Sequence, residues 1–264
     1  MSELAVEGFR AERAALLEVA NSLSDDEWNA ASDCEGWTVR DVYAHLASTI
    51  HGIVDPAFMA DMSGGTEAAM EAPVAERRSR PVADSVAEYE EFSAKAADAG
   101  AMLQGEGIGD TLLPMGDLGT HPMRLMPNIL LFDSYCHLRN DILAPNGPID
   151  RPAPPNDEQR VGPTVEWMLA GLPWMCASLA TIVERPFVLE LTGPGGGAFT
   201  VSSAGPEGRV VISAGAAPDA AATATSSAVD FVVWGTQRRP WRDYVKVAGD
   251  ERYADQILDA INII

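Results

Sequence analysis

The spacing of apolar residues changes once along this chain, near Arg185, and this change constrains the fold more than any other feature. Before it, apolar residues recur at helical intervals, as at Leu4, Phe9 and Leu16. After it, the segments PFVLELTG and GAFTVSS flank a run of glycines and have the pattern of a β-hairpin. We therefore expect a mostly α fold, with a helical domain at 1–184 followed by a small α+β domain at 185–264.

Proline and glycine clusters divide the helical part into five expected helices. These helices cover about 3–23, 38–54, 84–103, 123–143 and 164–183. The connections at 55–83, 105–122 and 145–155 are expected as loops, the first with room for a short helix. Later, strands are expected over 186–193, 197–203 and 208–215, an Ala-rich link over 214–225, and helices from about 226 and over 251–261.

The acidic net charge of the chain argues against some classes of binding partner. The net charge is −21 and the pI about 4.4, so the surface repels phosphate backbones and anionic lipid. We expect no nucleic-acid or membrane partner. Three cysteines far apart in the sequence do not form a disulfide framework, which favours a reducing cytoplasm. We also expect neither a secretory signal nor a membrane span, because no apolar run approaches the ~18 residues that a span needs.

Within the expected helices, two histidines follow an aspartate by four residues, in the pairs Asp41/His45 and Asp133/His137. Positions i and i+4 share one face of a helix. Asp141 continues the face of the second pair, so a polar stripe runs along an otherwise apolar helix and needs a partner. A divalent metal shared by two helices would provide one, since imidazole and carboxylate both suit zinc. Ordinary hydrogen-bonded histidines remain an alternative, with Asp41 as a helix cap and Asp141 paired with Arg139.

Two stretches carry a resemblance to a known family. The stretch WNAASDCEGWTVRDVYAHLAS, from Trp28, resembles the N-terminal signature of the mycothiol-dependent maleylpyruvate isomerase family, one of the DinB-like bundles. The stretch FDSYCHLRNDI is similar to the second signature of that family, and DYVKVAGDERYADQIL to the end of its small C-terminal domain. The resemblance implies a DinB-like four-helix bundle followed by a small α+β, SCP2-like domain.

The resemblance also implies a metal site. One divalent metal, usually zinc, has three protein ligands in the family, and these map onto His45, Asp133 and His137. Where the family isomerase has a glutamate, this chain has Asp133, which is one methylene shorter. An open metal position would ionise a thiol, here mycothiol as a possible cosubstrate. Cys34 and Cys136 are expected to be structural.

Two further residues are candidates for catalysis. His121 lies in the loop ahead of the expected fourth helix and is a possible acid, base or substrate contact. Arg238 belongs to a small basic cluster that could clamp a substrate carboxylate, because arginine donates in a bidentate fork. Plain loop and surface roles remain open for both.

Three functions remain open. The first is a metal-dependent, thiol-using isomerase or S-transferase that acts on a small electrophilic substrate. The second is a non-catalytic metal- or ligand-binding regulatory bundle, and the third is a metal-dependent hydrolase. The sequence names neither the substrate nor the metal, and it leaves the oligomeric state open.

Overall fold

We analysed a computed structural model of the chain, which describes residues 2–105, 107–203, 205 and 208–263. The chain divides into two compact units. The first contains the residues up to Gly116 and Thr120–Pro155, and the second contains Asp117–Gly119 and the residues from Asn156 onward. Among the described residues, no helix has the length and apolar character needed to cross a membrane.

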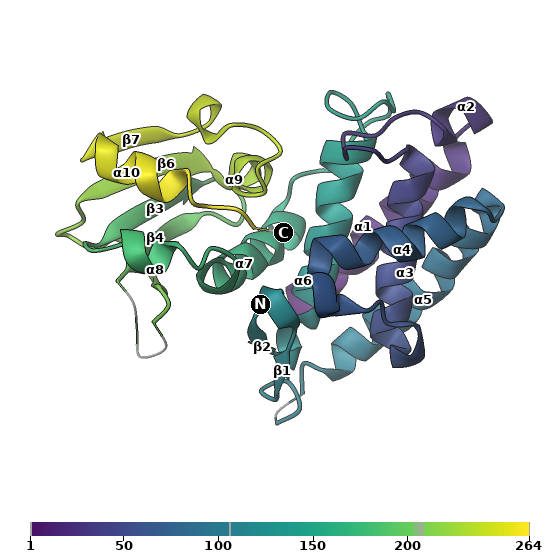
Figure 1. Cartoon of the computed structure of the whole chain (residues 1–264), viewed down its shortest axis with the longest axis horizontal. Coiled ribbons are helices and arrows are strands. Elements are labelled where there is room, and N and C mark those ends of the chain that lie inside the picture. The colour runs from purple at the N-terminus through teal and green to yellow at the C-terminus, as the bar shows by residue number, and fades with distance from the viewer. Residues whose placement is uncertain (1, 106, 204, 206–207, 264) are drawn as a thin grey trace. The chain divides into compact units, whose positions relative to one another are not determined.

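The first unit is a helical bundle. Its main helices are α1 (Ser2–Ser22), α3 (Val39–Val54), α5 (Val82–Met102) and α6 (Met126–Cys136), with the short α2 (Asp25–Trp28) between the first two. Helix α3 packs on α5, and α1 packs on both α5 and α6 (Figure 1). The interior is filled by fully buried large side chains: Phe9, Leu16, Tyr43, Leu46, Tyr89 and Leu131. The expected bundle is thereby confirmed.

Two connections of this unit contain more structure than we expected. Helix α4 (Thr66–Arg78) occupies the stretch expected as a loop with room for a short helix, after 3₁₀ turns at Pro56–Phe58 and Met62–Gly64. The glycine-rich stretch expected as a loop holds a hairpin of β1 (Leu112–Pro114) and β2 (Thr120–Pro122). With three residues each, these strands are too short to leave an alternating pattern in the sequence.

The second unit is built on a five-stranded sheet with the order β5-β4-β3-β6-β7. The strands are β3 (Phe187–Thr192), β4 (Gly197–Ser202), β5 (Val211–Ala214), β6 (Ala222–Ser227) and β7 (Lys246–Gly249). All neighbours are antiparallel except β3 and β6. The helices are α7 (Glu158–Met175), α8 (Leu179–Ile182), α9 (Ala228–Gly235) and α10 (Glu251–Leu258) (Figure 1).

The structural division differs in position from the boundary expected near residue 185. Helix α7 belongs to the second unit because it packs on α9 and β5. Arg185 marks the passage from helix to strand within that unit, not the passage between units. The expected fold class, a mostly helical chain with a C-terminal sheet domain, is confirmed.

Candidate metal centre

Three side chains from two helical segments converge inside the first unit. His45 comes from the middle of α3, Asp133 from α6, and His137 from the π-helical turn η5 (His137–Ile142) that continues α6. Oδ1 of Asp133 lies 3.3 Å from Nε2 of His45 and 3.3 Å from Nε2 of His137. Both histidines are buried. The three residues predicted as ligands therefore lie together, and we call them the triad.

The spacing of the triad fits a metal ion. Tetrahedral ligands about 2.0–2.1 Å from zinc are roughly 3.3 Å apart. The distances from Oδ1 of Asp133 to Nε2 of His45 and to Nε2 of His137 have this value. All three ligand atoms lie within 4.8 Å of one another. Oδ2 of Asp133 is buried and accepts no hydrogen bond from any residue that the structure describes. A buried carboxylate oxygen with an unused lone pair is costly, and a cation would use it.

The metal-free electrostatics show how strongly this pocket favours positive charge. Burial alone would raise the pKa of Asp133, but the charge of His45 and hydrogen bonds from His137 and His45 outweigh it and hold that pKa far below its usual range. Burial alone would lower the pKa of His137, but hydrogen bonds to Asp133 and Asp141 raise it well above its ordinary value. Both shifts have one physical cause, since the carboxylates of this pocket favour positive charge on the groups beside them.

The other nitrogen of His137 has its own neighbours. Nδ1 lies 2.7 Å from Oδ2 of Asp141 and 3.7 Å from Sγ of Cys34. Asp141 is 1% exposed, so it does not lie on the surface, where the alternative of a pair with Arg139 or another cation placed it. Arg139 instead forms an ion pair with Glu12.

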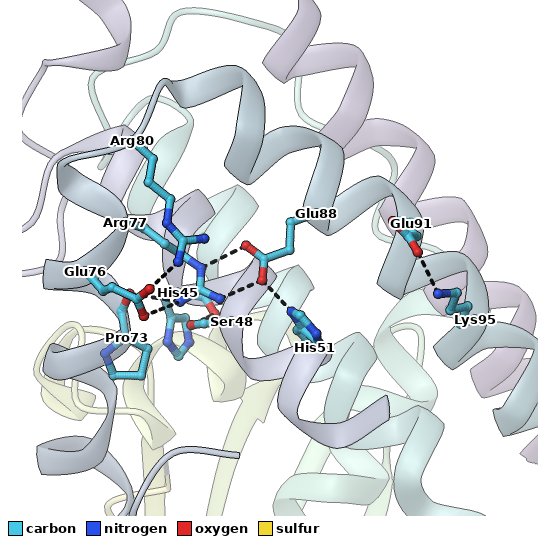
Figure 2. A network of polar contacts seen from close by, with 10 residues as sticks. All are labelled: His45, Ser48, His51, Pro73, Glu76, Arg77, Arg80, Glu88, Glu91 and Lys95. Atoms are coloured by element: carbon cyan, nitrogen blue, oxygen red, sulfur yellow. Dashed lines mark hydrogen bonds and ion pairs between the residues drawn. The ribbon is translucent and has the colours of Figure 1, made fainter. Parts of the chain in front are cut away.

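Asp41 does not share the triad. Its carboxylate caps α3 by accepting hydrogen bonds from the backbone N–H and the hydroxyl of Thr38, and it pairs with Arg78 at 3.0 Å. The capping role expected for Asp41 is thus confirmed. His51, which the helical spacing turns away from His45, lies 2.6 Å from Glu88, and Arg77 binds the same carboxylate (Figure 2).

Several neighbours of His45 were not singled out from the sequence. The hydroxyl of Thr49 lies 3.5 Å from Nδ1 of His45 and 3.5 Å from the sulfur of Met70 in α4. The ring of Trp37 is half-buried, and its centroid lies 5.3 Å from that of His45. Thr49 could have been found, since it follows His45 by four residues. Met70 could not, because its stretch was expected as a loop.

The two catalytic candidates lie outside the triad. His121 is buried in β2, opposite Leu113 of β1. Arg238 follows α9 in the second unit, where its backbone N–H donates to the carbonyl of Val233. The triad is complete within the first unit, and catalytic roles for His121 and Arg238 stay predictions.

Comparisons with known proteins agree with this architecture. Residues 9–127 match the family model described as the mycothiol maleylpyruvate isomerase N-terminal domain. The matched range includes His45 and ends before Asp133 and His137. No curated protein is significantly similar to the chain.

Solved structures extend the similarity to the whole chain. The crystal structure of the mycothiol-dependent maleylpyruvate isomerase has a TM-score of 0.58 and 14% identity, and the match covers 94% of this chain and 93% of that one. A histidine-to-alanine mutant of that enzyme matches with a TM-score of 0.57, the same identity and the same coverage. At this identity the likeness establishes the fold of the chain.

Proposed function

Because residues 9–127 match the model of the mycothiol maleylpyruvate isomerase N-terminal domain, we propose that this protein is a metal-dependent, thiol-using isomerase or S-transferase. Its substrate would be a small electrophile, and its cosubstrate a low-molecular-weight thiol such as mycothiol. The observation that carries the proposal is the pair of 3.3 Å contacts through which Asp133 joins His45 and His137.

In this proposal His45, Asp133 and His137 hold a divalent metal, with zinc as the best fit to two imidazoles and a carboxylate. Bound there, zinc would supply a Lewis acid that stabilises the thiolate form of an incoming thiol at neutral pH. The protein would contribute two buried histidines as neutral ligands and the half-buried Asp133 as the anionic one. The ring of Trp37 lies beside His45, and Met70 contacts Thr49, whose hydroxyl lies 3.5 Å from Nδ1 of the same histidine.

Asp133 is the ligand at which this chain departs from the isomerase that it resembles. The shorter side chain still reaches both histidine nitrogens. The departure therefore bears on the shape of the substrate space more than on metal binding. We propose that the substrate is an electrophile other than maleylpyruvate, with maleylpyruvate as the first compound to test.

A cytoplasmic location belongs to the same proposal. Cys34, Cys136 and Cys176 are free thiols, which fits a reducing compartment. A thiol-using reaction also needs a pool of reduced cosubstrate.

Metal analysis of the purified protein and two ligand variants tests the proposal. We expect bound metal in the wild type and its loss from both His45→Ala and His137→Ala. His51→Gln is the matched control, since His51 lies on α3 beside Glu88 and outside the triad. A thiol-dependence assay on the loaded protein follows. Metal retained in both ligand variants, or an electrophile converted equally well without thiol, would count against the proposal.

A further inference from the structure

The two ring nitrogens of His137 face different groups. Nε2 faces Asp133, on the side of the triad, whereas Nδ1 faces Asp141 at 2.7 Å. An ionised carboxylate can only accept hydrogen bonds, so the proton of this contact belongs to Nδ1. A ring that carries its proton on Nδ1 presents the lone pair of Nε2 to the triad, which is the form that binds a metal there.

The backbone holds Asp141 in this place. His137–Ile142 forms a π-helical turn, a rare feature that is frequent at functional sites. The carbonyl of Asp141 accepts a 3.0 Å hydrogen bond from the N–H of Asp33, which ties the turn to the loop before α3. Behind the turn, a Cβ on Gly147 would lie 2.3 Å from the carbonyl of Ile142. The turn is thus packed tightly on both sides.

We propose that Asp141 is a positioning residue for the metal site: by accepting the Nδ1–H of His137, it fixes the ring orientation that turns Nε2 toward Asp133 and His45. This inference rests on the proposed function, because it assigns Asp141 a role in metal affinity. It adds to that function a residue that makes no contact with the ion.

Cys34 is the competing explanation for the same nitrogen. Its sulfur lies 3.7 Å from Nδ1, farther than the carboxylate, and a thiol is a weak hydrogen-bond partner. Cys34, His137 and Asp141 also offer ligand atoms that lie within 4.8 Å of one another. The shorter contact and the charge of the carboxylate favour Asp141 as the group that orients the ring.

The same unit supplies a matched control. His51 and Glu88 form a second histidine–carboxylate contact at 2.6 Å, with both side chains mostly buried (Figure 2). Glu88 is held by Arg77 and has no place in the triad. Glu88→Gln therefore removes a buried carboxylate of the same kind, and its effect reports general damage to the bundle.

The experiment compares the wild type with Asp141→Asn, Glu88→Gln and Cys34→Ser by two measurements. Zinc affinity is measured by competition with a chromophoric chelator. The ¹⁵N and ¹H signals of the Nδ1–H of His137 are measured by NMR in the metal-free protein. We expect Asp141→Asn to lose about 10–100-fold in zinc affinity, as is typical of groups that orient metal ligands, and to shift the Nδ1–H signal upfield. We expect the other two variants to stay within about twofold of the wild type.

Wild-type affinity in Asp141→Asn, an equal loss in Glu88→Gln, or a larger loss in Cys34→Ser would overturn the inference. So would an Nδ1–H signal that Asp141→Asn leaves unchanged. If the wild type binds no zinc at all, the proposed function fails. The NMR signal of the metal-free protein still decides whether Asp141 orients the ring.

Discussion

At the scale of single residues, Asp133 is the residue that links the two histidines of the candidate metal centre. One of its oxygens touches both histidines of the triad, and the other is buried with no hydrogen-bond donor among the described residues. A cation at the triad would give this second oxygen a partner. In the proposed function, this residue is also the one at which the chain departs from the isomerase that it resembles, so we expect Asp133 to affect both metal affinity and the choice of substrate.

Replacing Asp133 by asparagine should separate the effect of its charge on zinc affinity from the effect of its size. The amide keeps the size of the side chain but removes the negative charge, so we expect zinc affinity to fall by at least about tenfold. Asp133→Glu keeps the charge and should retain zinc. Isothermal titration with zinc measures both variants, and an asparagine variant that binds zinc as the wild type does would remove Asp133 from the ligand set.

Zinc affinity should also depend on pH. The pKa of His137 is raised well above 6.5 in the metal-free protein, so the ion must displace a proton from it. Affinity should therefore rise with pH until that pKa is passed and level off beyond it. The same shift stabilises the metal-free fold fully below the unfolded pKa, and this gain is lost as pH rises through the folded value. Zinc titrations across neutral and alkaline pH test the sign, and affinity that falls with rising pH would contradict it.

At the scale of elements, a buried ion cluster joins three helices of the bundle. Arg77 of α4 and His51 of α3 both reach the carboxylate of Glu88 on α5 (Figure 2). The rings of Phe58 and Phe92 stack on His51 at centroid distances of 4.2 and 3.6 Å. Through this cluster and the contact of Met70 with Thr49, α4 is fixed beside the helix that carries His45.

Removing the Glu88 carboxylate should lower the unfolding free energy of the protein. Glu88→Ala leaves the buried charge of Arg77 without its partner, so we expect a loss at the lower end of about 3–5 kcal/mol in unfolding free energy. Glu91→Ala is the control, because it breaks an exposed pair with Lys95 on the same helix and should cost less than about 0.5 kcal/mol. Urea unfolding measures both, and equal losses would contradict a special role for the cluster.

The cluster should also respond to acid. Burial alone would raise the pKa of Glu88, but hydrogen bonds from Arg77 and His51 outweigh it and lower that pKa below 4.5. Its contribution to stability is present above the unfolded pKa and is lost as pH falls through the folded value. The difference in unfolding free energy between wild type and Glu88→Ala should therefore shrink in acid, and a difference that grows instead would contradict this sign.

The elements also show what the sequence could predict. The main helices of the bundle, α4 excepted, and the stripe of Asp133, His137 and Asp141 follow from spacing alone, because helical periodicity is local. The inner strand β6 was missed because its sequence, ATATSS, lacks the large β-branched and aromatic residues typical of buried strands. The π-helical turn was missed because only tertiary contacts, such as the backbone bond from Asp33, select it over an ordinary helix.

At the scale of the whole molecule, the fold is shared with proteins of 14% identity, whereas the predicted ligands lie within one unit. Such low identity over 94% of the chain means that the pattern of apolar positions, rather than particular residues, maintains the architecture. The surface charge of −21 would attract cations and repel anionic competitors, and it does not by itself select a site. The site must be located directly.

A crystal of the zinc-loaded full chain, measured at the zinc absorption edge, locates the ion most directly. We expect one dominant anomalous peak, about 2.0–2.2 Å from Nε2 of His45, Nε2 of His137 and a carboxylate oxygen of Asp133. A dominant peak among Cys34, His137 and Asp141, or no peak within the bundle, would contradict a metal site at the triad.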